Sequence, residues 1–342
     1  MSVKPIPGFE SLKTYHCITG SILHIYTFHD YDISEDMLLG LGSGVGFIYW
    51  HMKGEPPFIG GRANIERPGV EGLEKTLGRR TGVVVESFRT SSARKAESSL
   101  LEMLEANEPV MLQVDMGFLP YLDLPEGYHF GHHVVVAAGY NPEKRQVLIA
   151  DRDGGLHAVL LDTLEQARGS KFKPFPPQHA WWRFDFYNSH PPRAEDIHIA
   201  IREVSIGMLE PAISNFGVKG IRKTAEQALK WHEKMDDEQL RWTCFNTFVF
   251  IDATGGTGGG IFRFMYSRYL REAAGILADE RLIAISDSFW SIGDRWQEVA
   301  GIFKLAANQD IDRQTILHQT TKPLMELADQ EEQVWEKLLT IV

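Results

Sequence analysis

Cys17 is the residue of this sequence whose surroundings best suit a nucleophile. Apolar residues follow it at Ile18, Ile22 and Ile25, a spacing that fits one face of a helix and places Cys17 at the helix N-terminus. There the helix dipole and unpaired backbone N–H groups favour the thiolate. A lone cysteine can equally be a small buried hydrophobic residue. Cys244, inside an apolar helical run, receives that interpretation.

A second group of polar residues lies at the ends of two neighbouring apolar segments. The pair His132-His133 precedes residues 134–138, and residues 147–150 end at Asp151. If the two segments pair as a hairpin, a histidine and Asp151 meet at one end, as a base and its orienting carboxylate must. A metal site, or a structural histidine at a strand end, is the alternative for a histidine pair. No zinc-like spacing of cysteine and histidine accompanies it, and we expect no metal.

These residues need a helix and a sheet to bring them together, and the first half of the chain shows patterns of both. Pro68 favours a helix over 68–77, and Ser91 or Ser92 suits the cap of another that ends before Pro109. Apolar runs bounded by turn residues predict strands at 110–114, 134–138, 147–149 and 158–161. Such close spacing indicates a largely antiparallel sheet.

Residues 188–194 contain adjacent prolines, interrupt every periodicity and suit a linker. Beyond them the pattern predicts helices at 218–235, 237–253, 261–278, 282–306 and 315–339. The predicted fold class is α+β. An N-terminal domain, residues 1–190, has the antiparallel sheet and the nucleophile helix, and residues 195–342 form a mostly α-helical domain.

The composition excludes some classes of partner. A formal net charge of −11 disfavours nucleic acid, although the same acidity is also common on an ordinary protein surface. Neither a signal peptide nor a membrane-spanning segment is visible, so we expect a cytoplasmic protein without a membrane partner. The sequence leaves the oligomeric state open, with a homodimer as one option.

The histidine segment resembles that of papain-like cysteine peptidases. His133 is followed six residues later by Gly139 and Tyr140, and Asp151 stands in the place of their orienting Asn or Asp. The resemblance implies that Cys17 is the nucleophile, His133 the base and Asp151 the orienting carboxylate. Because neighbouring strand residues point to opposite faces, only one of His132 and His133 can approach Cys17. The spacing to Gly139 and Tyr140 selects His133.

A closer resemblance, over roughly residues 10–160, is to the butirosin biosynthesis protein H N-terminal family. The segments that carry it are Tyr15-His16-Cys17, Gly40-Leu41-Gly42-Ser43-Gly44 and the run GHHVVVAAGY at 131–140. The chain after the linker is similar to the helical domain that commonly follows this family. That likeness rests on the glycine-rich residues 254–260 and on Arg263, Tyr266 and Arg268.

The resemblance implies an acyltransferase of antibiotic and other specialised-metabolite biosynthesis. Such an enzyme moves an acyl group from the phosphopantetheine thioester of an acyl carrier protein, through Cys17, to a small amine; in the founding member the acceptor is an aminoglycoside. The implied partners are therefore a carrier protein and an amine substrate. No tightly bound cofactor is expected, since phosphopantetheine arrives as the donor group.

Three questions stay open from the sequence. Residues 11–16 lack the glutamine that papain-like peptidases use in the oxyanion hole, which leaves the Cys17 N–H as one donor and His16 as one candidate for the second. Residues 254–260 with Arg263 suit either an anion such as the pantetheine phosphate or a simple interhelical turn. A cysteine peptidase or amidase, or a non-catalytic binding protein with a buried Cys17, are the alternative functions.

Overall fold

The computed structural model describes residues 3–51, 56–173, 175–255, 259–308 and 311–342. By its internal contacts the chain divides into two compact units. Unit 1 contains the residues up to Leu38 and Thr81–His190, and unit 2 contains Leu39–Arg80 and Pro191–Val342. Residues 39–80, which the sequence pattern assigns to the N-terminal domain, thus group with the C-terminal helices. The domain boundaries themselves remain a prediction.

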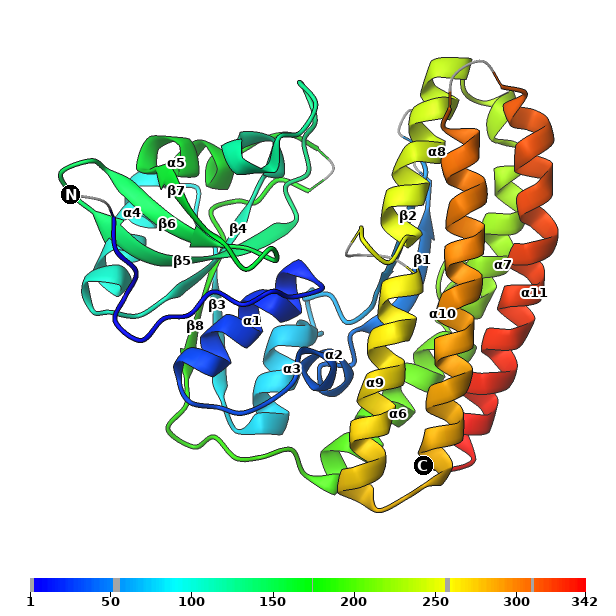
Figure 1. Ribbon diagram of the computed structural model, residues 1–342, viewed down its shortest axis with the longest axis horizontal. Helices are drawn as coiled ribbons and strands as arrows, with labels where there is room; N and C mark the ends of the chain where they lie inside the picture. Colours follow the sequence, from blue (N-terminus) through cyan, green and yellow to red (C-terminus); the bar gives the residue numbers. More distant parts are fainter. Residues whose placement is uncertain (1–2, 52–55, 174, 256–258, 309–310) are drawn as a thin grey trace. The chain divides into compact units, whose positions relative to one another are not determined.

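Unit 1 is built on a six-stranded sheet in which every pairing is antiparallel (Figure 1). The strands are β3 (Val84–Phe88), β4 (Val110–Val114), β5 (His133–Asn141), β6 (Gln146–Ala150), β7 (Leu156–Leu160) and β8 (Trp181–Asp185), in the order β3-β8-β4-β5-β6-β7. The α+β fold class and the antiparallel sheet are therefore confirmed. The sequence pattern did not predict β3 and β8.

Helix α1 (Cys17–Phe28) packs against β4 and β5 through its apolar face. Ile18, Ile22 and Ile25 on that face are at most 2% exposed, which confirms the predicted helix. The other helices of unit 1 are α4 (Ala93–Glu105), α5 (Leu161–Gly169) and the 3-10 turns η1 (Met116–Phe118) and η2 (Pro120–Leu122). The Ser92 hydroxyl caps α4 by accepting the N–H of Lys95 at 3.2 Å, as predicted.

The N-terminal segment ahead of α1 is attached to the β6–β7 turn and to β5. Lys13 forms a β-bridge with Asp153, and the N–H of Thr14 donates to the carbonyl oxygen of Arg152 at 2.9 Å. Gly139 on β5 has to be glycine because a Cβ there would lie 2.3 Å from the carbonyl oxygen of Lys4. These contacts bring the first residue of α1 beside the end of β6.

Two helices lie near the boundary between the units. Helix α2 (Glu35–Leu41) begins in unit 1 and ends in unit 2, and α3 (Gly72–Thr81) ends at the second boundary. The helix predicted to begin at residue 68 begins at Gly72 instead. Gly69 and Gly72 have φ angles of +81° and +80°, so the backbone turns through the left-handed region before α3 starts.

Unit 2 combines an antiparallel hairpin, β1 (Val45–Trp50) with β2 (Phe58–Arg62), and a group of helices. They are α6 (Ala194–Leu209), α7 (Gly217–Ala228), α8 (Asp237–Ile251), α9 (Gly259–Leu277), α10 (Arg281–Ala306) and α11 (Arg313–Leu339), with the 3-10 turn η3 (Trp231–Glu233). Figure 1 shows α10 lying beside α9 and α11, on which it packs. The mostly helical character is confirmed, although α6 was not predicted. Within the described residues, none of the helices has the length and apolar character needed to cross a bilayer.

A fully buried ion pair lies at the centre of unit 2. Arg263 on α9 donates from Nε and Nη2 to the two carboxylate oxygens of Glu331 on α11, each at 2.8 Å, and from Nη1 to the carbonyl oxygen of Gly46. The indole N–H groups of Trp296 and Trp335 donate to the same carboxylate, at 2.7 and 3.0 Å. Both carboxylate oxygens of Glu331 and all three guanidinium nitrogens of Arg263 therefore have hydrogen-bond partners.

Candidate active site

The β5–β6 hairpin brings His133 and Asp151 together. Val136 pairs with Ala150, so Asp151, the next residue, lies diagonally across from His133 on the same face of the sheet. The imidazole Nε2 of His133 is 2.7 Å from Oδ2 of Asp151. Asp151 also accepts the Tyr121 hydroxyl at 3.0 Å and the N–H of Arg152 at 2.8 Å. These bonds fix the carboxylate, which in turn fixes the ring of His133.

Cys17 completes this group. Its thiol is hydrogen-bonded to the His133 side chain, whose Nε2 is held by Asp151, so that Nδ1 is the ring nitrogen left for the sulfur. Cys17, His133 and Asp151 are 6%, 3% and 6% exposed. The structure thus brings the three predicted residues into one buried contact chain. His132 instead lies beside the ring of Phe175, with 5.5 Å between ring centroids.

Opposite charges around Cys17 outweigh the effect of its burial. Burial alone would raise the pKa of the thiol, but His16 and His133 lower it well below the ordinary value. Burial would likewise lower the pKa of His133, but Asp151 and Cys17 raise it to about 9. The arrangement favours a thiolate beside an imidazolium. Burial raises the pKa of Cys244 to about 12, which favours the neutral thiol there.

The site includes residues to which the sequence pattern gave no role. Glu35, on α2, accepts the backbone N–H groups of Tyr15 and His16 at 2.7 and 2.8 Å and the hydroxyl of Thr19 at 2.8 Å. It is 5% exposed, and burial raises its pKa. Since Glu35 lies on a different helix, no local spacing marks it. The acidic residue therefore holds the chain that enters α1.

The first turn of α1 supplies backbone donors near the thiol. Its first helical hydrogen bond runs from the N–H of Gly20 to the carbonyl oxygen of His16, at 2.7 Å. The N–H groups of Cys17, Ile18 and Thr19 precede that ladder, as the first N–H groups of every helix do. The Cys17 N–H can thus serve as one oxyanion donor.

Two other predicted features lie away from this group. Residues 256–258 of the glycine-rich segment 254–260 are outside the described residues, and Arg263, the cation expected beside them, is engaged by Glu331 and Gly46. Arg263 is therefore not available to a phosphate, and the part that the anion interpretation gave to Arg263 was wrong. In the motif at 40–44, Ser43 donates to Glu203 and accepts from Arg80, both at 2.8 Å. The motif stabilises unit 2.

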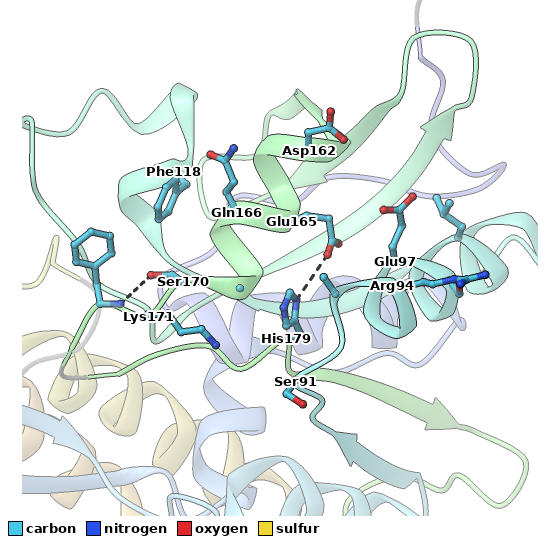
Figure 2. Close-up of a pocket in the computed structure, with 15 residues that line it drawn as sticks. Ser91, Arg94, Glu97, Phe118, Asp162, Glu165, Gln166, Ser170, Lys171 and His179 are labelled. Atoms are coloured by element: carbon cyan, nitrogen blue, oxygen red, sulfur yellow. Dashed lines mark hydrogen bonds and ion pairs between the residues drawn. The ribbon is translucent and has the colours of Figure 1, made fainter.

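Unit 1 also contains a pocket of about 1020 Å³ between α4 and α5 (Figure 2). Arg94 and Lys171 line it together with Glu97, Asp162 and Glu165, so its charge is mixed. It contains neither cysteine nor any residue of the Cys17 group. In the part of the chain that the structure describes, no cluster of three or more His, Cys, Asp or Glu side chains is arranged to hold a metal. The Cys17 group is therefore the best candidate site.

Two family models match this chain, one over the residues of the candidate site and one over most of the C-terminal helices. A family model described as butirosin biosynthesis protein H, N-terminal, matches residues 16–152, which contain Cys17, His133 and Asp151. A second model, a domain of unknown function named DUF4872, matches residues 162–338, about half of the chain. A comparison with curated proteins finds no match. The chain therefore belongs to the family in which a butirosin biosynthesis protein H N-terminal domain is followed by a DUF4872 domain.

Proposed function

We propose that this protein is a cysteine-dependent acyltransferase of specialised-metabolite biosynthesis. It would take an acyl group from a carrier-protein or pantetheine thioester onto Cys17 and pass it to a small amine. The observation that carries the proposal is the buried contact chain Cys17–His133–Asp151. The family supports a biosynthetic acyltransferase-like role.

In the first half of the reaction, the Cys17 thiolate attacks the thioester carbonyl of the donor. The oxyanion that forms accepts the Cys17 N–H, and its collapse breaks the carbon–sulfur bond to pantetheine. His133 gives its proton to the departing pantetheine sulfur and becomes neutral. Asp151 keeps the ring oriented throughout, because its Oδ2 holds Nε2 at 2.7 Å.

In the second half, the acceptor amine attacks the acyl-Cys17 carbonyl. Neutral His133 takes the proton that the nitrogen loses, the bond between carbon and the Cys17 sulfur breaks, and an amide leaves. The thiolate and the imidazolium are then restored. The same residues therefore serve both steps without a further cofactor in the proposed cycle.

The burial of the site supports transfer over hydrolysis. With Cys17 6% exposed, the thiol suits a slender pantetheine arm better than an extended polypeptide, which needs an open groove. A site with little access to bulk water also protects the acyl-cysteine long enough for an amine to reach it.

The test offers the protein an acyl-pantetheine thioester with and without a panel of polyamines and aminosugars, and follows the enzyme and products by intact mass. We expect an acyl adduct on Cys17 that the right amine discharges as an amide. Cys17→Ala should lose the adduct, whereas Cys244→Ala, the matched control, should keep it.

Other outcomes identify the other functions. Discharge at the same rate without an amine, together with cleavage of peptide substrates, assigns a hydrolase. If neither the wild type nor Cys244→Ala forms an adduct with any thioester, while Cys17→Ala binds pantetheine as well as the wild type, the protein is a non-catalytic binding protein.

A further inference from the structure

A second imidazole contacts the thiol of Cys17. The side chain of His16, the residue before Cys17, is hydrogen-bonded to it, as that of His133 is from β5. His16 is 2% exposed, so its ring is enclosed rather than solvated. The reacting sulfur thus lies between two imidazoles, while the proposed acyl transfer uses one.

His16 is held in place from two sides. The Thr19 hydroxyl donates to Oε1 of Glu35 at 2.8 Å, so the Thr19 oxygen is left to accept from Nδ1 of His16, which lies 3.3 Å away. Glu35 also accepts the backbone N–H of His16 at 2.8 Å. The ring of His16 is therefore linked to the buried carboxylate of Glu35 through the Thr19 hydroxyl. The ring of His133 is bonded to the Asp151 carboxylate directly.

We infer that His16 is a second catalytic residue of the proposed acyl transfer: it donates to the Cys17 sulfur and stabilises that sulfur as nucleophile and as leaving group. Thr19 and Glu35 are its positioning residues. The inference rests on the proposed function for the reaction, but the contact with the thiol stands without it.

His133 and His16 have different roles in the second half of the reaction. As the amine attacks the acyl-Cys17 carbonyl, its proton passes to His133, and the carbon–sulfur bond breaks with its electron pair on the sulfur. The N–H of His16 donates to that thiolate and transfers no proton. A sulfur held in this way is a better leaving group, because the leaving thiol departs faster when its pKa is lower.

Several ionisable groups surround the thiol and enter any pH profile. His16, the N-cap residue of α1, and His133 on β5 contact it, and the carboxylates of Glu35 on α2 and Asp151 after β6 lie behind these two rings. Tyr121 donates to Asp151, and Arg152 donates from its guanidinium to the carbonyl oxygen of Tyr15 at 3.2 Å. A variant of His16 changes one of these groups only.

The experiment measures the rate of Cys17 alkylation by iodoacetamide from pH 4 to 9 in the full chain, with thiolate absorbance near 240 nm as a second readout. His16→Ala should move the midpoint of the profile upward by about one pH unit, which means about tenfold less thiolate on the acid side. His16→Gln, which keeps an N–H donor but removes the imidazole, should lie between. Thr19→Val, which keeps the shape but removes the hydroxyl, should shift the midpoint in the same direction by less.

His132→Ala is the matched control, since it removes the neighbouring histidine that lies beside Phe175, and its midpoint should stay at the wild-type value. Thermal unfolding is followed for each variant, and if His16→Ala does not fold, His16→Gln decides. A midpoint unchanged in His16→Gln and Thr19→Val would overturn the inference. A shifted midpoint without any acyl transfer would overturn the proposed function and leave the role of His16 at the thiol intact.

Discussion

Two buried charged clusters, one in each unit, have opposite organisations. Around Arg263 and Glu331 the charges are matched one to one, and the N–H groups of two tryptophans and a carbonyl oxygen are further partners. Around Cys17 two imidazoles face a single sulfur, and the first N–H groups of α1 lie next to it. The first cluster is closed, whereas the second contains the thiol that we propose as the nucleophile.

The difference shows why burial of charge is a poor guide to function by itself. A buried ion pair whose bonds are all made stabilises one arrangement of helices and has nothing left for a ligand. A buried thiol whose pKa two neighbouring imidazoles lower is a potential nucleophile, and such a perturbed pKa is typical of an active site. Arg263 suited an anion site from its sequence context and proved structural for this reason.

The largest expected effect concerns the two cysteines. At pH 7 a thiol with a pKa of about 12 is ionised in on the order of one molecule in 10⁵, whereas the lowered pKa of Cys17 favours its thiolate. We expect iodoacetamide to label Cys17 more than about a thousandfold faster than Cys244 in the folded protein. Peptide mapping checks this, and preferential labelling of Cys244 would contradict the assignment.

The second largest effect should follow removal of the proposed base, His133. His133→Ala should slow acylation of Cys17 by about 10²- to 10⁴-fold, because the proton transfers lose their partner. His132→Ala should change the rate little. Rapid-quench mass spectrometry with an acyl-pantetheine measures both rates. Equal losses in the two variants would mean that the choice between these histidines is wrong.

A substitution in the cluster of Arg263 and Glu331 should change the stability of the protein rather than its reaction rate. Glu331→Gln leaves Arg263 with a buried, uncompensated charge and should lower the free energy of unfolding of unit 2 by about 3 kcal/mol or more. Its neighbour Glu332, partly exposed and paired with Arg222, is the matched control, and Glu332→Gln should cost less than about 1 kcal/mol. Urea unfolding followed by tryptophan fluorescence compares them. Equal costs would show that the buried pair is not the stabilising feature.

The pH dependence of acylation should show two limbs. The rate should rise as the Cys17 thiol ionises, below its ordinary pKa, and fall as His133 loses its proton, at a pKa of about 9. Near pH 10 the rate should be about tenfold below the plateau. Cys17→Ala supplies the blank for spontaneous thioester hydrolysis. A rate that keeps rising beyond pH 10 would exclude the imidazolium as proton donor.

The smallest expected effect concerns the hydrogen bonds that hold Asp151, the partner of His133. Tyr121→Phe removes one hydrogen bond to the Asp151 carboxylate and keeps the two from His133 and Arg152. We expect a loss of about 1–2 kcal/mol in stability and less than about a tenfold loss in acylation rate. Tyr128→Phe, on a tyrosine elsewhere in unit 1, is the control. A loss as large as that of His133→Ala would assign Tyr121 a direct part in the reaction.

Much of the fold was predictable where the chain pattern is local. The strands at 110–114, 134–138 and 147–149 and most of the C-terminal helices follow from apolar periodicity and from caps such as Ser92. Helix α6 was missed because it begins directly after the prolines of the expected linker, which masked its start. The grouping of residues 39–80 with unit 2 depends on contacts with distant helices, which no window of sequence contains.

The candidate site divides in the same way. The proximity of His133 and Asp151 follows from a hairpin, and the position of Cys17 follows from one amphipathic helix. Glu35 could not be identified, because an acidic residue in the first turn of a helix is common and only tertiary packing brings it to the backbone of Tyr15 and His16.

The attachment of the N-terminal segment to the β6–β7 turn has a consequence for synthesis on the ribosome. Cys17 is translated early, but Arg152 and Asp153, the turn residues that pair with the segment before it, emerge only after most of unit 1 has been made. Residues 39–80 emerge in between, and their partners come later still. The nascent chain therefore carries an ordinary thiol until at least Asp151 has emerged, and the contacts that lower the pKa of Cys17 form only when the hairpin of β5 and β6 has closed on it.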